Sequence, residues 1–292
     1  MSKLTNGLLS PLGAKELLPI RPMSEYNRNT NYPQAWSQYA ATLTGPVTLK
    51  VAGYATTIEI TEAQLTGVYF PLLTMLQDLQ QSSEKRVIAG LAGIPGSGKT
   101  AFTAALTHVA HALFPMSWFS AVGMDGWHLS NQVLDKRTIN NGAGKAIPLR
   151  RRKGCPESFD VSVLCKALAE LHQAEGIVKL PVYDRQRHDP IPEALTVLPQ
   201  TRVLLVEGNY LLDDNPPWDA VSSQLHPKLF LECDADLARQ RVIARHIRGG
   251  LTEQTASAKF ELNDRANTEI VSAAASCADV RIQLEPEPRI QG

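Results

Sequence analysis

The segment from Gly93 to Thr100 reads Gly-Ile-Pro-Gly-Ser-Gly-Lys-Thr and constrains this chain more than any other feature. It satisfies the phosphate-binding loop pattern G-x-x-x-x-G-K-[ST] at every fixed position. An apolar strand is predicted before it and a helix after it. Because glycines let backbone N–H groups converge on an anion at a helix N-terminus, the segment predicts a phosphate site. The alternative, a chance glycine turn, is disfavoured by the flanking strand and helix.

Two side chains of this loop have specific expected roles. Lys99 supplies a positive charge for β- and γ-phosphates, and the Thr100 hydroxyl is a candidate Mg²⁺ ligand. The predicted nucleotide-binding residues are Gly93, Ile94, Pro95, Gly96, Ser97, Gly98, Lys99, Thr100 and Ala101.

Composition limits the partners that the chain is expected to have. The 292 residues carry a formal net charge of zero, so no global field draws the chain to nucleic acid or to a membrane. No apolar run is long enough to span a bilayer, and the N-terminus lacks the apolar core of a signal peptide. The four cysteines lie far apart without metal or redox spacing. We therefore expect a cytoplasmic protein that binds neither nucleic acid nor a membrane.

Residues 1–84 are predicted to form a small α+β extension. Residues 1–45 show no clear periodicity and are expected to be an irregular arm or a short helical element. Two short strands, 47–51 and 56–60, are predicted around a turn at Gly53. A helix is predicted over residues 61–79, with Thr61 as N-cap.

Residues 85–292 alternate between strand and helix patterns. This alternation predicts an α/β fold, the three-layer sandwich of P-loop NTPases with a mainly parallel sheet. Ligands of such sheets bind outside the carboxyl ends of the strands, so polar residues that follow strands become site candidates. The expected strands are Val87–Ala92, Trp118–Met124, Ile177–Val182, Val203–Val206, Leu229–Glu232 and Val280–Leu284, and the expected helices cover about 99–113, 160–174, 235–248 and 253–276.

Two acids directly follow expected strands. Asp125 would share the crevice with the phosphate loop, where a base for an acceptor hydroxyl is needed in phosphoryl transfer; its alternative role is a cap. Glu207 stands where P-loop enzymes place the acid that holds Mg²⁺, and its alternative role is a structural ion pair. His128 is expected to be packed rather than catalytic.

Basic side chains gather in two places. The run 150–153 is either a solvated face or part of an acceptor site. In the helix 235–248, Arg241, Arg245 and Arg248 share a face, and the sequence shows no acid between Asp236 and Glu253 to compensate them. This pattern predicts a mobile lid over about 239–252 with Arg241 and Arg245 as clamps on the transferred phosphoryl group; an ordinary basic surface helix is the alternative.

Two further segments are weaker candidates. The loop Pro181–Asp189 mixes charges as an acceptor-binding loop does. Asn263 and Asn267 share a helical face. The alternative for both segments is ordinary surface polarity.

Together these residues resemble the P-loop kinase group of bacterial pantothenate kinase, uridine kinase and phosphoribulokinase, from about Val47 to the end. The most specific segments are Met124-Asp125-Gly126, 152–160, Pro181-Val182-Tyr183 and Val206-Glu207-Gly208-Asn209. Residues 183–190 and 207–212 are most similar to poorly characterised bacterial nucleoside-kinase-like proteins, some labelled fructose-transport kinases.

The resemblance implies a kinase domain over residues 85–292 that uses ATP and Mg²⁺ and acts on a small-molecule acceptor, with a homodimer as one possible assembly. It implies catalytic roles for Asp125, Lys99, Arg241 and Arg245, and metal ligation by Thr100 and Glu207. The expected acceptor-binding residues are Lys153, Tyr183, Arg185, His188 and Asn209. Arg185 stands where pantothenate kinases carry a His, which argues against pantothenate as the acceptor.

The sequence thus favours transfer of the γ-phosphoryl group of ATP to a hydroxyl of a sugar, a nucleoside or a pantothenate-like compound. The alternative is a P-loop GTPase, ATPase switch or metallochaperone-type protein without such an acceptor. No Asn-Lys-x-Asp guanine-reading motif occurs.

Overall fold

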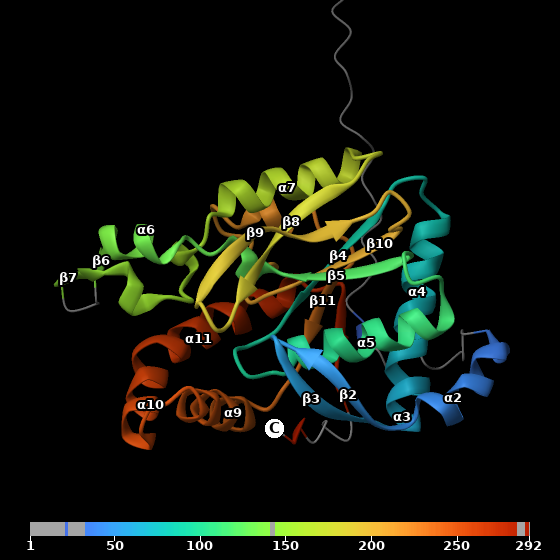
Figure 1. The fold of residues 1–292 in the computed structure, drawn as a ribbon, viewed down its shortest axis with the longest axis horizontal. Coiled ribbons are helices and arrows are strands. Elements are labelled where there is room, and N and C mark those ends of the chain that lie inside the picture. The colour runs from blue at the N-terminus through green and yellow to red at the C-terminus, as the bar shows by residue number, and fades with distance from the viewer. Residues whose placement is uncertain (1–20, 23–32, 141–143, 285–289, 292) are drawn as a thin grey trace, which may run out of the picture.

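A six-stranded parallel sheet forms the centre of the computed structural model, which describes residues 21–22, 33–140, 144–284 and 290–291. The strand order is β1-β12-β11-β4-β10-β5, and every neighbouring pair is parallel (Figure 1). The strands are β1 (Arg21–Pro22), β4 (Val87–Ala92), β5 (Phe119–Gly123), β10 (Val203–Glu207), β11 (Lys228–Leu231) and β12 (Val280–Ile282). The predicted α/β class with a mainly parallel sheet is confirmed.

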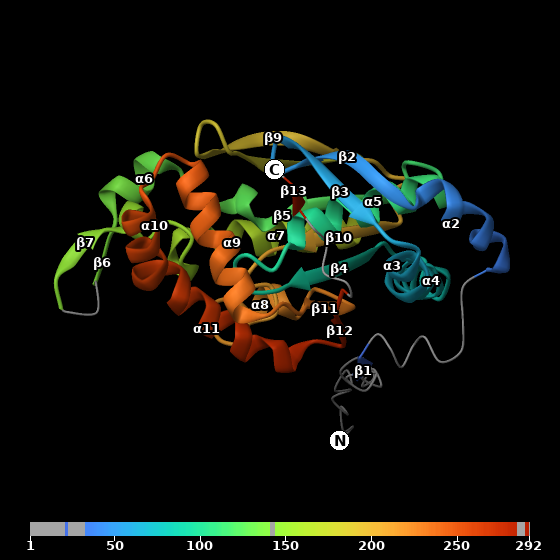
Figure 2. The same ribbon diagram turned by 90° about the horizontal axis from the view of Figure 1, so that it is seen from below.

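Alternating strand residues enter two separate cores, one on each face of the sheet. In β10, Val203 and Leu205 join the core formed with α4 (Phe70–Gln81) and α5 (Lys99–Leu113). Leu204 and Val206 join the core formed with α7 (Val161–Gln173), α8 (Asp219–Ser222) and α11 (Arg265–Ala273). Since successive side chains of a strand point to opposite faces, this split produces the three layers visible in Figure 2.

The N-terminal extension packs on the helix that follows the phosphate loop. Strands β2 (Gly45–Val51) and β3 (Tyr54–Ile60) form the expected hairpin, turning at Ala52 and Gly53, which both have positive φ. The hairpin lies against α5, and β13 (Ile290–Gln291) adds to β3 as a third strand. Before it lie a 3-10 turn (Gln34–Trp36) and α2 (Ser37–Leu43); most of the predicted arm, 1–20 and 23–32, falls outside the described residues.

The predicted helix over 61–79 is present with a wide turn in its middle. It comprises α3 (Glu62–Gln64), a π-helical turn (Leu65–Tyr69) and α4. Thr61 caps its start through a capping box with Gln64, as expected for an N-cap threonine.

The expected strand 177–182 is real, but its predicted place in the parallel sheet is wrong. It is β8 (Val178–Asp184), and it pairs antiparallel with β9 (Asp189–Val197) in a separate two-stranded sheet. Strand β9 was not predicted because it contains two prolines, which argue against a strand. The turn of this hairpin carries residues 185–188, so the hairpin positions the predicted acceptor loop.

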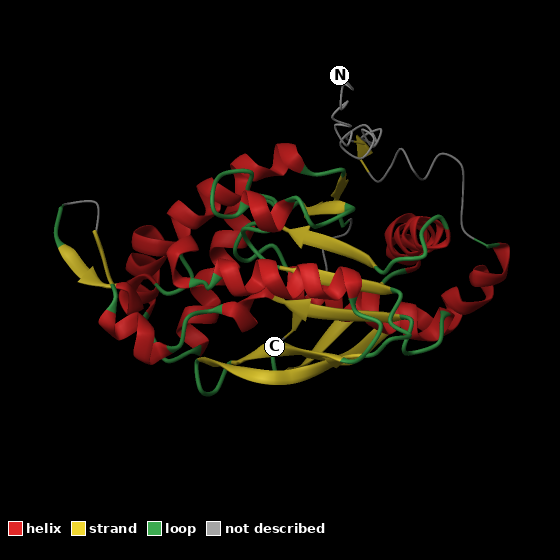
Figure 3. Cartoon of the chain, turned by 90° about the horizontal axis from the view of Figure 1, so that it is seen from above, coloured by secondary structure: helices red, strands yellow, loops and turns green. Residues whose placement is uncertain are grey.

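A second hairpin projects from one end of the molecule (Figure 3). It consists of β6 (Thr138–Asn140) and β7 (Ala146–Pro148) and follows the short helix α6 (Asn131–Lys136). Short 3-10 turns surround it at Met124–Trp127, Leu149–Arg152 and Pro156–Ser158.

The predicted helix 235–248 matches α9 (Ala235–Arg248), which Asp234 caps. The single helix expected over 253–276 is instead a series of α10 (Glu253–Lys259), a π-helical turn (Phe260–Asp264), α11 and a 3-10 turn (Ala274–Cys277). Within the described residues, no helix is both long and apolar enough to cross a membrane.

Candidate active site

The phosphate loop joins β4 to α5 with the backbone that its glycines were predicted to allow. Gly96 and Gly98 have φ of +87° and +92°, a region that side chains rarely adopt. A Cβ on Gly96 would collide with the carbonyl of Ala238 in α9, and one on Gly93 would lie 2.8 Å from Ser97 Oγ. The loop is therefore closely fitted between its own residues and α9.

Two groups of this loop are suited to bind an anion. The Lys99 ammonium is buried and donates to the carbonyls of Gly93 (2.5 Å) and Ile94 (3.1 Å), and burial lowers its pKa to about 8. The buried Ser97 hydroxyl has no hydrogen-bond partner within the described structure. Together with the free N–H groups at the start of α5, these groups match what a phosphate chain requires.

Thr100 and Glu207, the predicted metal ligands, lie side by side. Thr100 Oγ1 donates to Glu207 Oε1 over 3.0 Å. Glu207 ends β10, in register with Leu91 of β4 and Gly123 of β5, so its carboxyl group is held at the edge where the phosphate loop begins. Burial raises its pKa, and the charge of Lys99 opposes this rise.

A hydroxyl and a carboxylate oxygen are suitable ligands for Mg²⁺, which completes its shell with water and substrate phosphates. No cluster of three or more His, Cys, Asp or Glu that could hold a metal occurs among the residues described. The residues present therefore fit a metal that arrives with a phosphate ligand rather than one held by a protein cage.

Asp125 follows β5 in a 3-10 turn and forms a short ion pair. Arg185 Nη2 donates to Asp125 Oδ2 over 2.6 Å. Burial alone would raise the pKa of Asp125, but the surrounding cations, led by Arg185, outweigh burial and lower it. The carboxylate is thus ionised and partly open, with 34% of its side chain exposed.

His128 is packed, as expected. Its ring lies 3.9 Å from the Phe159 ring and 5.1 Å from the Tyr183 ring, centre to centre, and its Nδ1 contacts the Asp125 carbonyl at 2.9 Å. Burial lowers its pKa. His128 therefore packs between the turn that carries Asp125 and the Tyr183 ring of β8.

The structure brings three of the predicted acceptor residues together. The Lys153 ammonium and the Arg185 guanidinium lie 5.0 and 5.1 Å from the centre of the Tyr183 ring. Lys153 Nζ also donates to Asn131 Oδ1 (2.7 Å) and to the His188 carbonyl (2.6 Å), and burial lowers its pKa to about 8. Lys153 therefore ties α6 to the β8–β9 turn.

The other two predicted acceptor residues are placed differently. His188 is exposed and contacts Lys153 through its backbone carbonyl rather than its ring. Its φ of 52° places it in the tight turn. Asn209 lies in the bend after β10, half-buried, two residues beyond Glu207.

Of the two interpretations of Asn263 and Asn267, ordinary surface polarity is wrong. They are 5% and 2% exposed and donate to the carbonyls of Lys153 and Gly154, both over 3.2 Å. Tyr210 donates to the same Gly154 carbonyl at 2.6 Å. Their common helical face was a usable signal, but their partners lie more than 100 residues away in the chain.

The run 150–153 is divided between two roles. Arg150 pairs with Asp135 at 3.5 Å on the surface, whereas Arg152 Nε donates to Asn263 Oδ1 at 3.0 Å. Neither sequence alternative, a solvated face or an acceptor site, describes the whole run.

Helix α9 lies against the phosphate loop, and acids from outside the helix pair with two of its basic side chains, Arg239 and His246. Arg239 pairs with Glu261 at 3.3 Å and covers the Phe260 ring at 5.3 Å. His246 meets Asp264 at 2.9 Å. The compensating acids come from the π-helical turn, which folds back along α9.

The two predicted clamp residues lie at different points of α9. Arg241 is half-buried, with Nη1 3.6 Å from Cys233 Sγ. Arg245 is exposed, and its charge acts on Lys99, Asp125 and Arg185. The charge of Arg245 therefore favours the ionised form of Asp125 and opposes the charges of Lys99 and Arg185.

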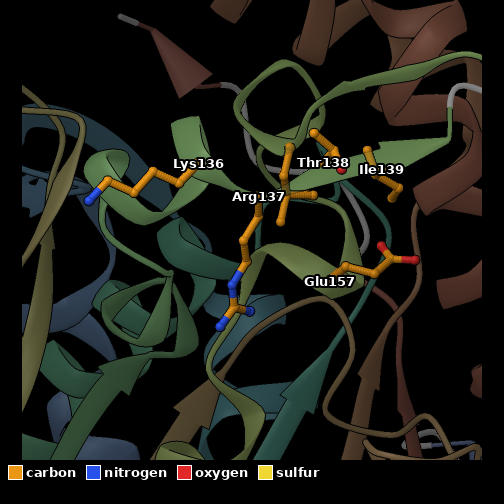
Figure 4. A pocket seen from close by; sticks show the side chains of 6 residues that line it. Lys136, Arg137, Thr138, Ile139 and Glu157 are labelled. Carbon is orange, nitrogen blue, oxygen red and sulfur yellow. The ribbon is translucent and has the colours of Figure 1, made fainter.

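A hollow of about 450 Å³ lies beside the projecting hairpin (Figure 4). None of the predicted site residues lines it; its walls are Lys136, Arg137, Thr138, Ile139, Leu149 and Glu157.

Comparison with known proteins places this geometry in a kinase context. The phosphoribulokinase / uridine kinase family matches residues 87–291. The uncharacterized protein YggC of Escherichia coli K12 is 33% identical over 83% of this chain and 97% of its own length. A pantothenate kinase of Levilactobacillus brevis is 26% identical over 65% of this chain and 64% of its own length.

Two solved structures share the fold. One from Silicibacter sp. TM1040, provisionally named a fructose transport system kinase, has 32% identity and a TM-score of 0.60, covering 70% of this chain and 98% of its own. The D-glycerate 3-kinase of Cryptococcus neoformans has a TM-score of 0.53 over 78% of this chain and 99% of its own, at 14% identity, which shows the fold alone.

Proposed function

The chain belongs to the phosphoribulokinase / uridine kinase family, and on that premise we propose that it transfers the γ-phosphoryl group of ATP to a hydroxyl of a small molecule. Membership of this family confirms the resemblance inferred from the sequence. The proposal is carried by one observation: Glu207 ends β10 and Asp125 follows the neighbouring strand β5, at the edge where the phosphate loop begins.

The donor half is the phosphate loop with α5. The loop N–H groups, Ser97 Oγ and Lys99 Nζ bind the phosphates of ATP, and Lys99 exchanges its two carbonyl partners for phosphate oxygens. Thr100 and Glu207 would hold Mg²⁺, which when bound neutralises charge on the phosphates.

The acceptor half is the Asp125 carboxylate and its surroundings. Asp125 orients the acceptor hydroxyl and receives its proton, while a bond forms between the hydroxyl oxygen and the γ-phosphorus. The bond from the γ-phosphorus to the bridging oxygen breaks, and ADP leaves. Arg245, whose charge already reaches Asp125 and Lys99, stabilises negative charge on the transferred group, with Arg241 as the second candidate on α9.

The test is ADP release from MgATP with a panel of sugars, nucleosides and vitamins. Asp125→Asn should lower kcat by about 10²–10⁴-fold while the Kd for ATP stays within a few-fold. Asp135→Asn is the matched control, because that carboxylate is 60% exposed and pairs only at the surface with Arg150. Unchanged turnover in Asp125→Asn would remove Asp125 from the mechanism.

The same assay distinguishes the kinase from a nucleotide-dependent switch. Strong preference for GTP over ATP, with hydrolysis that no acceptor stimulates, would favour the switch.

A further inference from the structure

The Arg185 guanidinium has binding capacity that the contacts of the described structure do not use. A guanidinium carries five N–H donors in a planar fork. One of them donates to Asp125 Oδ2, and the residues described provide no other hydrogen bond to this group. The side chain is 34% exposed, so the remaining donors are accessible from the space that the Asp125 carboxylate also faces.

Two contacts hold the Arg185 guanidinium in place. Arg185 lies 5.1 Å from the centre of the Tyr183 ring, within the range of a cation–π contact, and its other side is held by Asp125. An arginine held at a ring and at a carboxylate keeps its fork pre-organised, which lowers the entropy lost when a further anion binds.

The neighbouring cation is less available. Lys153 Nζ donates to Asn131 and to the His188 carbonyl, and its third neighbour is Asp189 at 3.9 Å. An ammonium has three N–H groups, so these partners occupy most of its capacity. Lys153 thus fixes the turn that carries Arg185, and Arg185 is the cation that is open to a ligand.

The electrostatic balance also leaves positive charge at this point. Arg185 and Arg245 oppose one another, since each is a cation close to Asp125. Nucleotide phosphates would neutralise Lys99 and Arg245 on the donor side. Asp125 is the main acid that offsets Arg185, with a smaller contribution from Glu207, and Asp125 also interacts with Lys99, His128 and Arg245. A second anion beside Arg185 is therefore favoured once the acceptor enters.

We propose that the acceptor is a hydroxylated anion, a carboxylate or a phosphate ester, and that Arg185 is the residue that selects it. The fork keeps one N–H on Asp125 Oδ2 and directs the others at the negative group of the acceptor. The hydroxyl of the same molecule then lies at Asp125 Oδ1, the carboxylate oxygen that does not accept the 2.6 Å hydrogen bond from Arg185. This inference rests on the proposed function, since it assigns a substrate class to that site.

The chemistry remains the transfer described above. The acceptor hydroxyl gives its proton to Asp125 and gains the phosphoryl group, ADP departs, and the negative group of the acceptor is unchanged. Because one guanidinium contacts both the base and the anion, the hydroxyl and the anion must belong to one compact molecule.

The experiment compares anions with neutral alcohols of similar shape. The pairs are D-gluconate with D-glucitol, D-glycerate with glycerol, and D-ribose 5-phosphate with D-ribose, so that carboxylate and phosphate are tested separately. ADP release gives kcat/KM for the wild type, Arg185→Gln, Arg185→Lys and Arg187→Gln. Arg187 is the matched control, two residues away, with a side chain that is 75% exposed.

In the wild type, at least one anion should exceed its neutral partner by about 10- to 100-fold in kcat/KM, the value of a charged hydrogen-bonded contact. Arg185→Gln should remove that ratio, Arg185→Lys should retain part of it, and Arg187→Gln should leave it intact. The ratio of kcat/KM for the anion to that for its neutral partner reports recognition of the negative group alone. Loss of Arg185 also changes the basicity of Asp125, but that change affects both members of a pair equally. A preference for neutral alcohols, or a ratio that survives in Arg185→Gln, would overturn the inference.

A binding measurement separates this inference from the proposed function. Calorimetry with each anion and a non-hydrolysable ATP analogue needs no turnover. Anion binding that depends on Arg185, without ADP release from any acceptor, would support the inference and refute the kinase activity. Turnover of neutral alcohols with no anion binding would support the kinase activity and refute the inference.

Discussion

Two buried side chains, Tyr210 and Asn267, donate hydrogen bonds to one carbonyl oxygen, that of Gly154. This oxygen follows Lys153, so the pair fixes the loop that ties α6 to the acceptor turn. Removing one donor leaves the carbonyl with the other. Removing both leaves a carbonyl for which the described residues offer no remaining hydrogen bond.

The magnitudes follow from this shared partner. Tyr210→Phe should cost about 0.5–1.5 kcal/mol of unfolding free energy, the net worth of one hydrogen bond, because the carbonyl keeps Asn267. Asn267→Ala should cost about 1–2 kcal/mol, since it also removes a few buried atoms. The double variant should lose about 1–3 kcal/mol more than the sum, because an unsatisfied buried carbonyl adds its own penalty.

Urea unfolding of the four proteins, followed by circular dichroism, measures this coupling energy. If the Gly154 carbonyl fixes the acceptor loop, the double variant should also have a higher KM for the acceptor than the wild type. Its Kd for ATP should stay near that of the wild type. Ser222→Ala is a control, because that buried hydroxyl has no partner among the described residues and lies away from the loop. Additive costs within about 0.5 kcal/mol would refute the idea that the two donors satisfy one carbonyl.

Three more outcomes are expected. Gly126→Ala would place a methyl group against the backbone of β8, so kcat/KM for the acceptor should fall by about 10-fold or more with little change in ATP affinity. Gly176→Ala is the control: a methyl group there meets no other atom within 4 Å, so neither quantity should change. Lys99 loses its proton in the free site near pH 8, whereas bound phosphate favours its charged form, so the affinity for ATP should fall as the pH rises from 8 to 10. Calorimetry in two buffers at pH 9 should detect proton uptake on ATP binding. Equal affinity at pH 7 and pH 10 would refute this. Thr100→Val removes the hydroxyl that contacts Glu207, so the Mg²⁺ concentration for half-maximal activity should rise about 10-fold in a titration, and an unchanged value would exclude Thr100 as a ligand.

The sequence predicts the donor half of the site well because its parts are contiguous. The residues from Gly93 to Thr100 are a local motif whose backbone geometry depends on the residues themselves, and the neighbouring strand and helix have clear periodicity. The strand-end positions of Asp125 and Glu207 follow from the parallel sheet, which alternation of strands and helices predicts. The ion pair of Asp125 with Arg185 does not follow, since 60 residues separate them.

The errors have particular physical causes. The antiparallel pairing of β8 was missed because its partner strand contains Pro190 and Pro192, which argue against a strand. The burial of Asn263 and Asn267 was not predicted, because polarity alone does not reveal burial when the partner is a distant backbone carbonyl. The acidic partners of Arg239 and His246 in α9 were missed because only nearby acids were considered, whereas Glu261 and Asp264 come from the next helical segment.

The acceptor half differs from the donor half in how it is built, and this difference bears on specificity. Its long-range hydrogen bonds join residues 22 to 113 positions apart, from α6, the 153–154 loop, the β8–β9 turn, the bend after β10, the π-helical turn and α11. Each contact can change without disturbing the phosphate loop, because the loop is fixed by its own glycines and by α9. A family with a constant donor half can therefore take new acceptors through single substitutions on the β8–β9 turn. Arg185 occupies that turn, contacts the base directly and is partly exposed, so it is the position where one exchange should alter the acceptor most.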